Sequence, residues 1–127
     1  MIKIAILNKD DFYSKLLASK LAKAFPGKLK RVTSFNSINN VTEHLAKIVT
    51  FDLIIIGDGV CADYPQLLKI LNCKKCIANS KRFYLNKIML DNGADWVIDK
   101  NTVFNSYSTF NVNPMAAWVK VISDWFF

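Results

Sequence analysis

Strand-like and helix-like patterns alternate five times along this sequence, and that alternation restricts the fold more than any other feature. Short runs of branched apolar residues predict strands at 2–7, 29–35, 52–56, 76–79 and 95–99. The run DLIII is almost continuously apolar, which indicates a strand covered on both faces. Strands of that kind belong to parallel sheets whose two faces are covered by helices.

A helix-like segment follows each predicted strand. In the first, apolar residues recur every four positions, which is the spacing of one helix face: Tyr13, Leu17, Leu21 and Phe25. The later segments begin at residues that are favoured N-caps: Ser37, Asp63, Ser80 and Asn113. Parallel strands need crossover helices, so we expect one flavodoxin-like α/β domain, residues 1–127, of the (βα)5 type. Its five-stranded parallel sheet is doubly wound, with the order 2-1-3-4-5.

Composition bounds the class of protein. The 127 residues are 52% hydrophobic, which is enough for one buried core. No apolar run approaches the ~20 residues that cross a bilayer, and no signal peptide follows Met1, so we expect a soluble, cytoplasmic protein. The net charge is +7, and residues 1–31 hold eight basic side chains against Asp10 and Asp11. A basic module that binds nucleic acid is therefore one alternative.

Polar residues gather where the predicted strands end. In a doubly wound sheet, ligands bind at the carboxyl ends of the strands, near the switch point between strands 1 and 3. The residues that arrive there are Asn8, Lys9, Asp10, Gly57, Asp58, Ser80 and Lys100. The segment LNKDDF after the first strand has no glycine, which argues against the nucleotide-binding fingerprints of dehydrogenases and P-loop enzymes. A small flavin enzyme of the same fold stays an alternative.

Three stretches carry a resemblance to a known family. They are KIAILNKDDF (3–12), FDLIIIGDG (51–59) and NGADWVIDKN (92–101). In this order and spacing, the chain resembles the receiver domain of two-component response regulators. The resemblance implies the fold predicted above and a phosphate taken from a histidine kinase onto an aspartate after strand 3. It also implies Mg²⁺ held by two acids after strand 1, with a Ser or Thr and a Lys that contact the phosphoryl group.

The resemblance assigns site residues by position. Ser80 and Lys100 take the hydroxyl and lysine places of the family. The phosphate-accepting aspartate falls on Gly57, and Asp58 follows one residue later. A shift of one residue along a strand turns a side chain to the other face, although flanking glycines allow the backbone to twist. Asp58 is therefore the candidate phosphoacceptor.

The two metal-binding acids of the family fall on Asn8 and Lys9. An ammonium in the metal position repels Mg²⁺. In that position, Lys9 is expected to act as a fixed cation that pairs with Asp58. Asp10 is a substitute metal ligand in principle, but we expect it to cap the first helix.

These observations lead to one expected function and, beside the flavin enzyme, two alternatives. We expect an atypical receiver-like signalling protein that is not an enzyme and acts by protein–protein interaction, without a metal or other cofactor. A conventional phosphorelay receiver, phosphorylated on Asp58 with Mg²⁺, is the first alternative, and the basic nucleic-acid-binding module is the second. The expected partners are a histidine kinase, another regulator or a second copy of the chain. They are expected to bind through the fourth predicted helix, which follows Ser80, the fifth predicted strand (95–99) and the fifth predicted helix, which follows Asn113.

Aromatic residues near the end of the chain suggest where partners bind. Trp and Phe are favoured anchors at protein interfaces. The interface candidates are Trp96, Phe104, Tyr107, Phe110, Trp118, Trp125, Phe126 and Phe127. Three of them lie in the long polar-aromatic connection 101–113, where ~2–6 residues are usual in this kind of fold.

Overall fold

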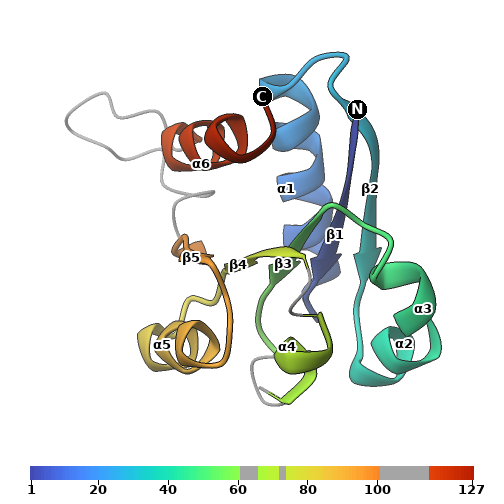
Figure 1. Ribbon diagram of the computed structural model, residues 1–127, viewed down its shortest axis with the longest axis vertical. Coiled ribbons are helices and arrows are strands. Elements are labelled where there is room, and N and C mark those ends of the chain that lie inside the picture. The colour runs from blue at the N-terminus through green and yellow to red at the C-terminus, as the bar shows by residue number, and fades with distance from the viewer. Residues whose placement is uncertain (61–65, 72–73, 101–114) are drawn as a thin grey trace.

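The computed structural model describes residues 1–60, 66–71, 74–100 and 115–127. Its centre is a five-stranded sheet in the order β2-β1-β3-β4-β5, in which every neighbouring pair is parallel (Figure 1). The strands are β1 (Ile2–Leu7), β2 (Leu29–Phe35), β3 (Leu53–Ile56), β4 (Lys75–Ala78) and β5 (Trp96–Val97). The predicted fold class is confirmed.

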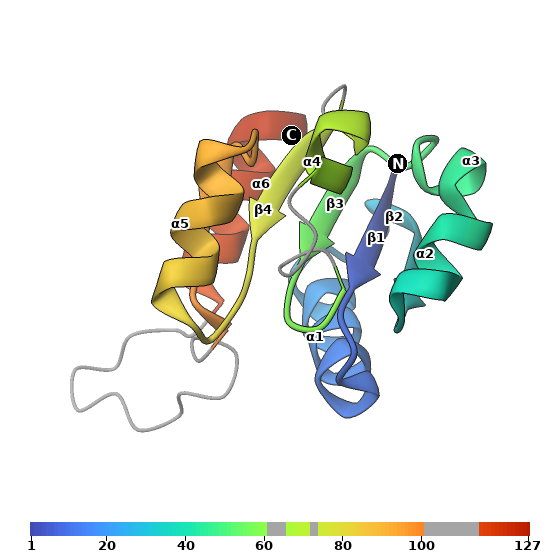
Figure 2. The ribbon, with the colours of Figure 1, turned by 90° about the horizontal axis from the view of Figure 1, so that it is seen from below.

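The helices in the described part of the chain cover both faces of this sheet. They are α1 (Asp11–Ala24), α2 (Ile38–Glu43), α3 (Leu45–Ile48), α4 (Gln66–Leu71), α5 (Phe83–Asp91) and α6 (Ala116–Phe126). Figure 2 shows α1 and α4 on opposite sides of the strands. No helix within the described ranges is both long and apolar enough to cross a membrane.

Two apolar cores, one on each face, result from the alternation of side chains along the strands. Leu17 of α1 and Trp118 of α6 share one core with Ile55 of β3. The preceding residue of the strand, Ile54, turns to the opposite face and packs with Met89 of α5 and other residues of α2–α5. Because β3 is central and fully buried, both of its faces are apolar, as the run DLIII predicted.

The helix starts were predicted in part. Asp10 caps α1 by accepting the Tyr13 backbone N–H at 3.0 Å, and Ser37 caps α2 by accepting that of Asn40 at the same distance. Ser80 is not an N-cap, which corrects the prediction: α5 begins at Phe83, and Arg82 is the N-cap residue, without a side-chain cap bond. The predicted caps Asp63 and Asn113 lie outside the described residues.

Candidate functional site

Asp58 lies just past the end of β3, where the alternation of side chains along a strand no longer applies. β3 ends at Ile56, and the Gly57 N–H donates to the Leu7 carbonyl oxygen at 2.8 Å. Gly59 then takes a positive φ of 75°, which glycine adopts without strain. The backbone therefore turns after the strand, and Asp58 ends up only 5% exposed.

Two side chains from neighbouring strands meet the Asp58 carboxylate. Ser80, which follows β4, donates its hydroxyl hydrogen to Asp58 Oδ1. Lys100, which follows β5, places Nζ 3.4 Å from Asp58 Oδ2 and 3.6 Å from Asp10 Oδ2. Lys100 is only 7% exposed, so water screens its pair with Asp58 weakly. The structure thus brings together three residues that the sequence placed at one edge of the sheet.

Asn86 fixes the turn that carries Ser80, a role that no pattern in the sequence indicates. Its Oδ1 accepts the Ser80 N–H at 2.7 Å, and its Nδ2 donates to the Ser80 carbonyl oxygen at 2.8 Å. The Arg82 N–H in turn donates to Ser80 Oγ at 3.0 Å. These bonds explain why the Ser80 hydroxyl bonds to Asp58 and does not cap the N-terminus of α5. The hydroxyl is held two residues before the N-cap position.

Tyr13 lies beside Lys100 and is bonded to Asn79, and the sequence patterns indicated neither residue as part of the site. The Tyr13 ring centroid is 4.6 Å from Lys100 Nζ. The Tyr13 hydroxyl donates to Asn79 Oδ1 at 2.5 Å, and Asn79 Nδ2 donates to the Ile98 carbonyl oxygen at 2.7 Å. Burial raises the pKa of Tyr13 above its ordinary value. The hydroxyl therefore keeps its proton at neutral pH and remains a donor.

Lys9 does not occupy the position that the sequence suggested. Its side chain is exposed, and its carbon stem lies over Gly59, with Cγ 2.7 Å from where a Cβ would stand. Among the ion pairs of the described residues there is no Lys9–Asp58 pair, although the Lys9 backbone N–H donates to the Asp58 carbonyl oxygen at 3.0 Å. Lys100 already neutralises the carboxylate, and an exposed ammonium keeps its hydration.

Gly57, where the aspartate of the resemblance falls, has no room for a side chain. A Cβ at this position would collide with the Asn8 side-chain amide and stand 3.0 Å from the Asn79 carbonyl oxygen. Asn8 is buried, and its Oδ1 accepts the Asp10 N–H at 2.9 Å. The amide therefore cannot move aside without losing that bond.

Asp10 belongs both to the cap of α1 and to the site. The hydrogen bond from the Tyr13 backbone N–H is the main cause that lowers the pKa of Asp10, and the Lys100 charge adds to it. A carboxylate whose pKa is lowered by folding stabilises the folded state at neutral pH. This contribution is lost as the pH falls through the folded-state pKa.

Comparison with known proteins extends this picture. No family model and no curated protein matches the sequence. Solved structures do: the signal receiver domain of a DNA-binding response regulator (merR) from Colwellia psychrerythraea aligns with a TM-score of 0.73 at 13% identity, over 98% of this chain and 98% of its own. A LuxR family DNA-binding response regulator from Silicibacter pomeroyi aligns with a TM-score of 0.70 at 20% identity, over 97% of this chain and 89% of its own.

This chain has the receiver fold. A putative pilus assembly protein (cpaE) from Burkholderia thailandensis shares the architecture, with a TM-score of 0.68 at 17% identity over 98% of this chain and 97% of its own. At such identities the likeness establishes the fold, and the function has to be argued from the site.

The receiver fold implies a Mg²⁺ site, and the residues present do not fit one. Magnesium takes oxygen ligands, usually carboxylates and water. Here Asp58 and Asp10 both direct Oδ2 to Lys100, and their other oxygens accept hydrogen bonds from the protein itself. Asn8 Oδ1 likewise accepts a backbone N–H. Within the described ranges no three His, Cys, Asp or Glu residues are placed to hold a metal ion.

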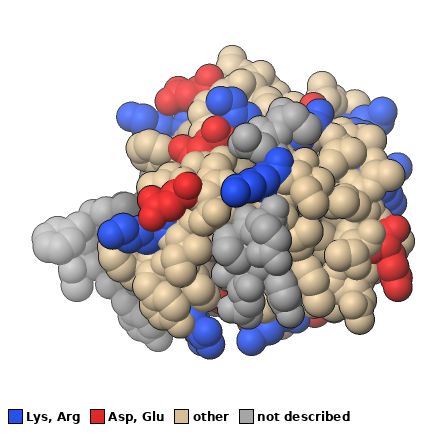
Figure 3. Space-filling view, turned by 60° about the horizontal axis from the view of Figure 1, so that its bottom comes forward, with Lys and Arg blue, Asp and Glu red and all other residues tan. Residues whose placement is uncertain are grey.

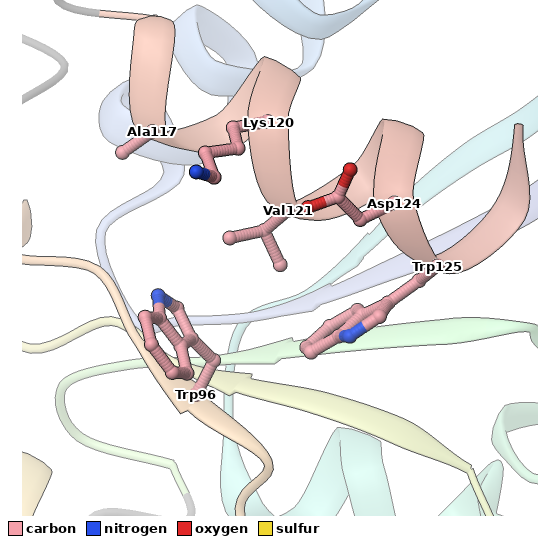
Figure 4. A pocket seen from close by; sticks show the side chains of 6 residues that line it. All are labelled: Trp96, Ala117, Lys120, Val121, Asp124 and Trp125. Atoms are coloured by element: carbon pink, nitrogen blue, oxygen red, sulfur yellow. The ribbon is translucent and has the colours of Figure 1, made fainter.

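An aromatic groove lies beside β5 in the receiver fold. It has a volume of about 280 Å³ and is lined by Trp96, Ala117, Lys120, Val121, Asp124 and Trp125. Figure 4 shows the two indole rings on either side of Val121, below α6. Trp96 is 53% exposed, whereas Trp125 is half-buried and lies under the Lys75 ammonium, 5.2 Å from the ring centroid.

The other interface candidates divide into three groups. Trp118 is fully buried in the core under α6, so it is not an interface residue, which corrects the prediction. Phe126 is half-buried against the same core, and Phe127 lies 5.7 Å from Phe25, ring centroid to ring centroid, with about half of its surface exposed. The last three, Phe104, Tyr107 and Phe110, lie outside the described residues.

The burial of the Lys100–Asp58 pair leads to a prediction for the stability of the fold. Lys100→Met should lower the free energy of unfolding by about 3–5 kcal/mol, because it leaves the Asp58 carboxylate buried without its counter-ion. Asp58→Asn should fall at the low end of that range, since Asp10 still faces Lys100. The double variant should lose less than the sum of the two. Urea unfolding followed by circular dichroism measures all three.

Lys15→Met is the matched control. Lys15 pairs with Asp11 at 3.7 Å on the exposed face of α1, so its removal should change the free energy of unfolding by less than ~0.5 kcal/mol. Additive effects of Lys100→Met and Asp58→Asn would contradict an energetic coupling between the two side chains.

The crowding at Gly57 makes a second prediction. Gly57→Ala should lower the free energy of unfolding by about 1–3 kcal/mol, because the new Cβ meets the Asn8 amide. Asn8→Ala in the same chain should recover part of that loss, since it removes the colliding atoms. Thermal unfolding of the single and double variants measures the effect, and an unchanged melting temperature in Gly57→Ala would show that the space is larger than the structure indicates.

Proposed function

We propose that this chain is a receiver-like signalling protein that acts by protein–protein contact, without magnesium-dependent phosphorylation of Asp58. The observation that carries the proposal is the state of the Asp58 carboxylate. One oxygen accepts the Ser80 hydroxyl hydrogen, the other faces Lys100, and the residue is buried. In this proposal Lys100 is the fixed cation of the site, in place of a divalent metal.

The chemistry of phosphoryl transfer supports this reading. An anionic phosphoryl group approaches a carboxylate only when cations neutralise the developing charge. In this chain the positions of the two metal-binding acids hold Asn8 and Lys9, and Lys9 turns to solvent. One lysine therefore has to neutralise Asp58 and Asp10, and an incoming phosphoryl group would add further negative charge.

A conventional phosphorelay receiver is the second candidate, and one observation favours it. Ser80 and Lys100 both contact Asp58, and these are the residue types that the resemblance places around a phosphoryl group. The candidate requires that Asp58 accept phosphate although it stands one residue after the family position.

The nucleic-acid-binding alternative has weaker support. It rests on the net charge of +7 and the basic first third of the sequence. On the face shown in Figure 3, basic and acidic side chains are interspersed and do not form one basic patch. Mixed charge of this kind is typical of an ordinary solvated surface.

A phosphodonor separates the first two candidates. The purified protein is incubated with acetyl phosphate and Mg²⁺, and its intact mass is measured. We expect no gain of a phosphoryl group, because Lys100 and Ser80 already engage both oxygens of Asp58. A receiver known to accept phosphate from acetyl phosphate serves as the positive control.

Asp58→Asn serves as the matched variant in that experiment. A mass gain in the wild-type chain that disappears in Asp58→Asn would overturn the proposal in favour of the phosphorelay. Beryllofluoride with Mg²⁺ gives a second readout, because a working acceptor site is stabilised against heat when it binds this phosphoryl analogue.

The contact surface proposed for this function is the face formed by α5, β5 and α6. β5 is one of the two edge strands of the described sheet, and Figure 1 shows it between α5 and α6. Exposed apolar side chains lie on α5 and β5: Phe83, Tyr84, Ile88, Leu90 and Trp96. Large apolar groups at a sheet edge are typical of protein interfaces. A second copy of the chain is the partner that we propose for this face.

Self-association tests this surface directly. Light scattering after size-exclusion chromatography should give an apparent mass that rises with protein concentration in the wild type. The double variant Trp96→Ala, Trp125→Ala should stay monomeric, because loss of a tryptophan anchor weakens an interface by about 2 kcal/mol or more. Phe12→Ala, at an exposed residue of α1, is the control. A wild-type chain that is monomeric at every concentration would exclude the second copy as partner.

A further inference from the structure

The Lys100 ammonium lies among three groups that attract a cation. Two are the carboxylates of Asp58 and Asp10, whose Oδ2 atoms are 3.4 Å and 3.6 Å from Nζ. The third is the ring of Tyr13, with its centroid 4.6 Å from the same atom. A cation at this distance from an aromatic face is attracted by the negative face of the ring.

We propose that Tyr13 is a positioning residue that holds the Lys100 ammonium against Asp58. The inference rests on the proposed function, in which Lys100 is the fixed cation of the site. A lysine side chain has several rotatable bonds, so contacts beyond the two carboxylates help to hold its ammonium in one place. The Tyr13 ring is such a contact, because its face attracts a cation.

Burial makes the ring contact effective. Tyr13 is fully buried and Lys100 is 7% exposed, so little water competes for the ammonium. Cation–π contacts are strongest where both partners are removed from water. The same contact on the surface, such as that of Lys28 over the exposed Phe127 at 4.9 Å, is screened by solvent.

The Tyr13 hydroxyl fixes the orientation of the ring. It donates to Asn79 Oδ1, and Asn79 Nδ2 donates to the Ile98 carbonyl oxygen. Asn79 directly precedes Ser80, and Ile98 lies two residues before Lys100. The hydroxyl thus links α1 to the segments that carry Ser80 and Lys100, the two residues that contact Asp58. A residue whose role was only to fill the core would not need this hydroxyl.

Chemical labelling of Lys100 tests this role. The full chain is treated with an amine-acylating reagent, and peptide mass spectrometry gives the rate at each lysine, with the exposed Lys9 as internal reference. In Tyr13→Leu we expect acylation of Lys100 to accelerate roughly tenfold relative to Lys9, because the ring contact that holds the ammonium is gone. In Tyr13→Phe the ring remains and only its hydroxyl bond to Asn79 is lost, so we expect a smaller acceleration than in Tyr13→Leu.

Leu17→Ala is the control for a purely structural effect. Leu17 is fully buried one turn further along α1 and packs in the same core. Its shortening opens a cavity and should leave the relative labelling of Lys100 within about twofold of the wild type, because it leaves the Tyr13 contact in place. Labelling of the buried Cys76 thiol reports any general opening of each variant.

Two results would overturn the inference. One is unchanged Lys100 labelling in Tyr13→Leu, and the other is equal acceleration in Tyr13→Leu and Leu17→Ala at matched Cys76 labelling. The assay contains neither phosphodonor nor metal. Its failure is therefore distinct from failure of the proposed function, which appears as a phosphoryl mass gain in the wild-type chain.

Discussion

The buried pair of Asp58 and Lys100 is the interaction on which the rest of the site depends. Each charge would be costly to bury alone, and the two are tolerated because each offsets the other and their remaining atoms also have partners. Ser80 donates a hydrogen bond to the Asp58 carboxylate, whereas the Asp10 carboxylate and the Tyr13 ring lie beside the Lys100 ammonium. Segments that follow β1, β3, β4 and β5 are thereby tied together by one pair of charges, and the parallel sheet is what delivers them to one edge.

Most of the fold follows from local patterns, because apolar spacing reports directly on which face of an element is buried. The bounds predicted for the first two strands agree with β1 and β2. Ser80 was wrong as a cap because a serine just before a helix looks the same in the sequence whether its hydroxyl serves the helix or a distant carboxylate. No local sequence pattern reveals that Asn86 holds that turn and that the Ser80 hydroxyl donates to Asp58.

The placement of Asp58, Ser80 and Lys100 at one edge of the sheet followed from the sequence, but their side-chain contacts did not, and the reason is again physical. Strand register places Asp58 and Lys9 at the carboxyl edge, yet the direction of a side chain beyond the strand depends on the turn that follows. After β3 that turn includes Gly59 with its positive φ, and the Lys9 stem lies over this glycine. Tyr13 was recognised as part of an apolar stripe, and a stripe gives no sign that one of its rings faces an ammonium.

A tethered ammonium and a bound Mg²⁺ differ in what controls their occupancy. Metal occupancy depends on concentration and affinity, so a metal site responds to its surroundings. The Lys100 ammonium is part of the chain, and its occupancy depends only on the packing that holds it, including the Tyr13 ring and the Asp10 carboxylate. Under the proposed function the cation of the site is therefore permanently in place, and any regulation has to act by moving these packed groups, for example through a partner that binds an adjoining helix.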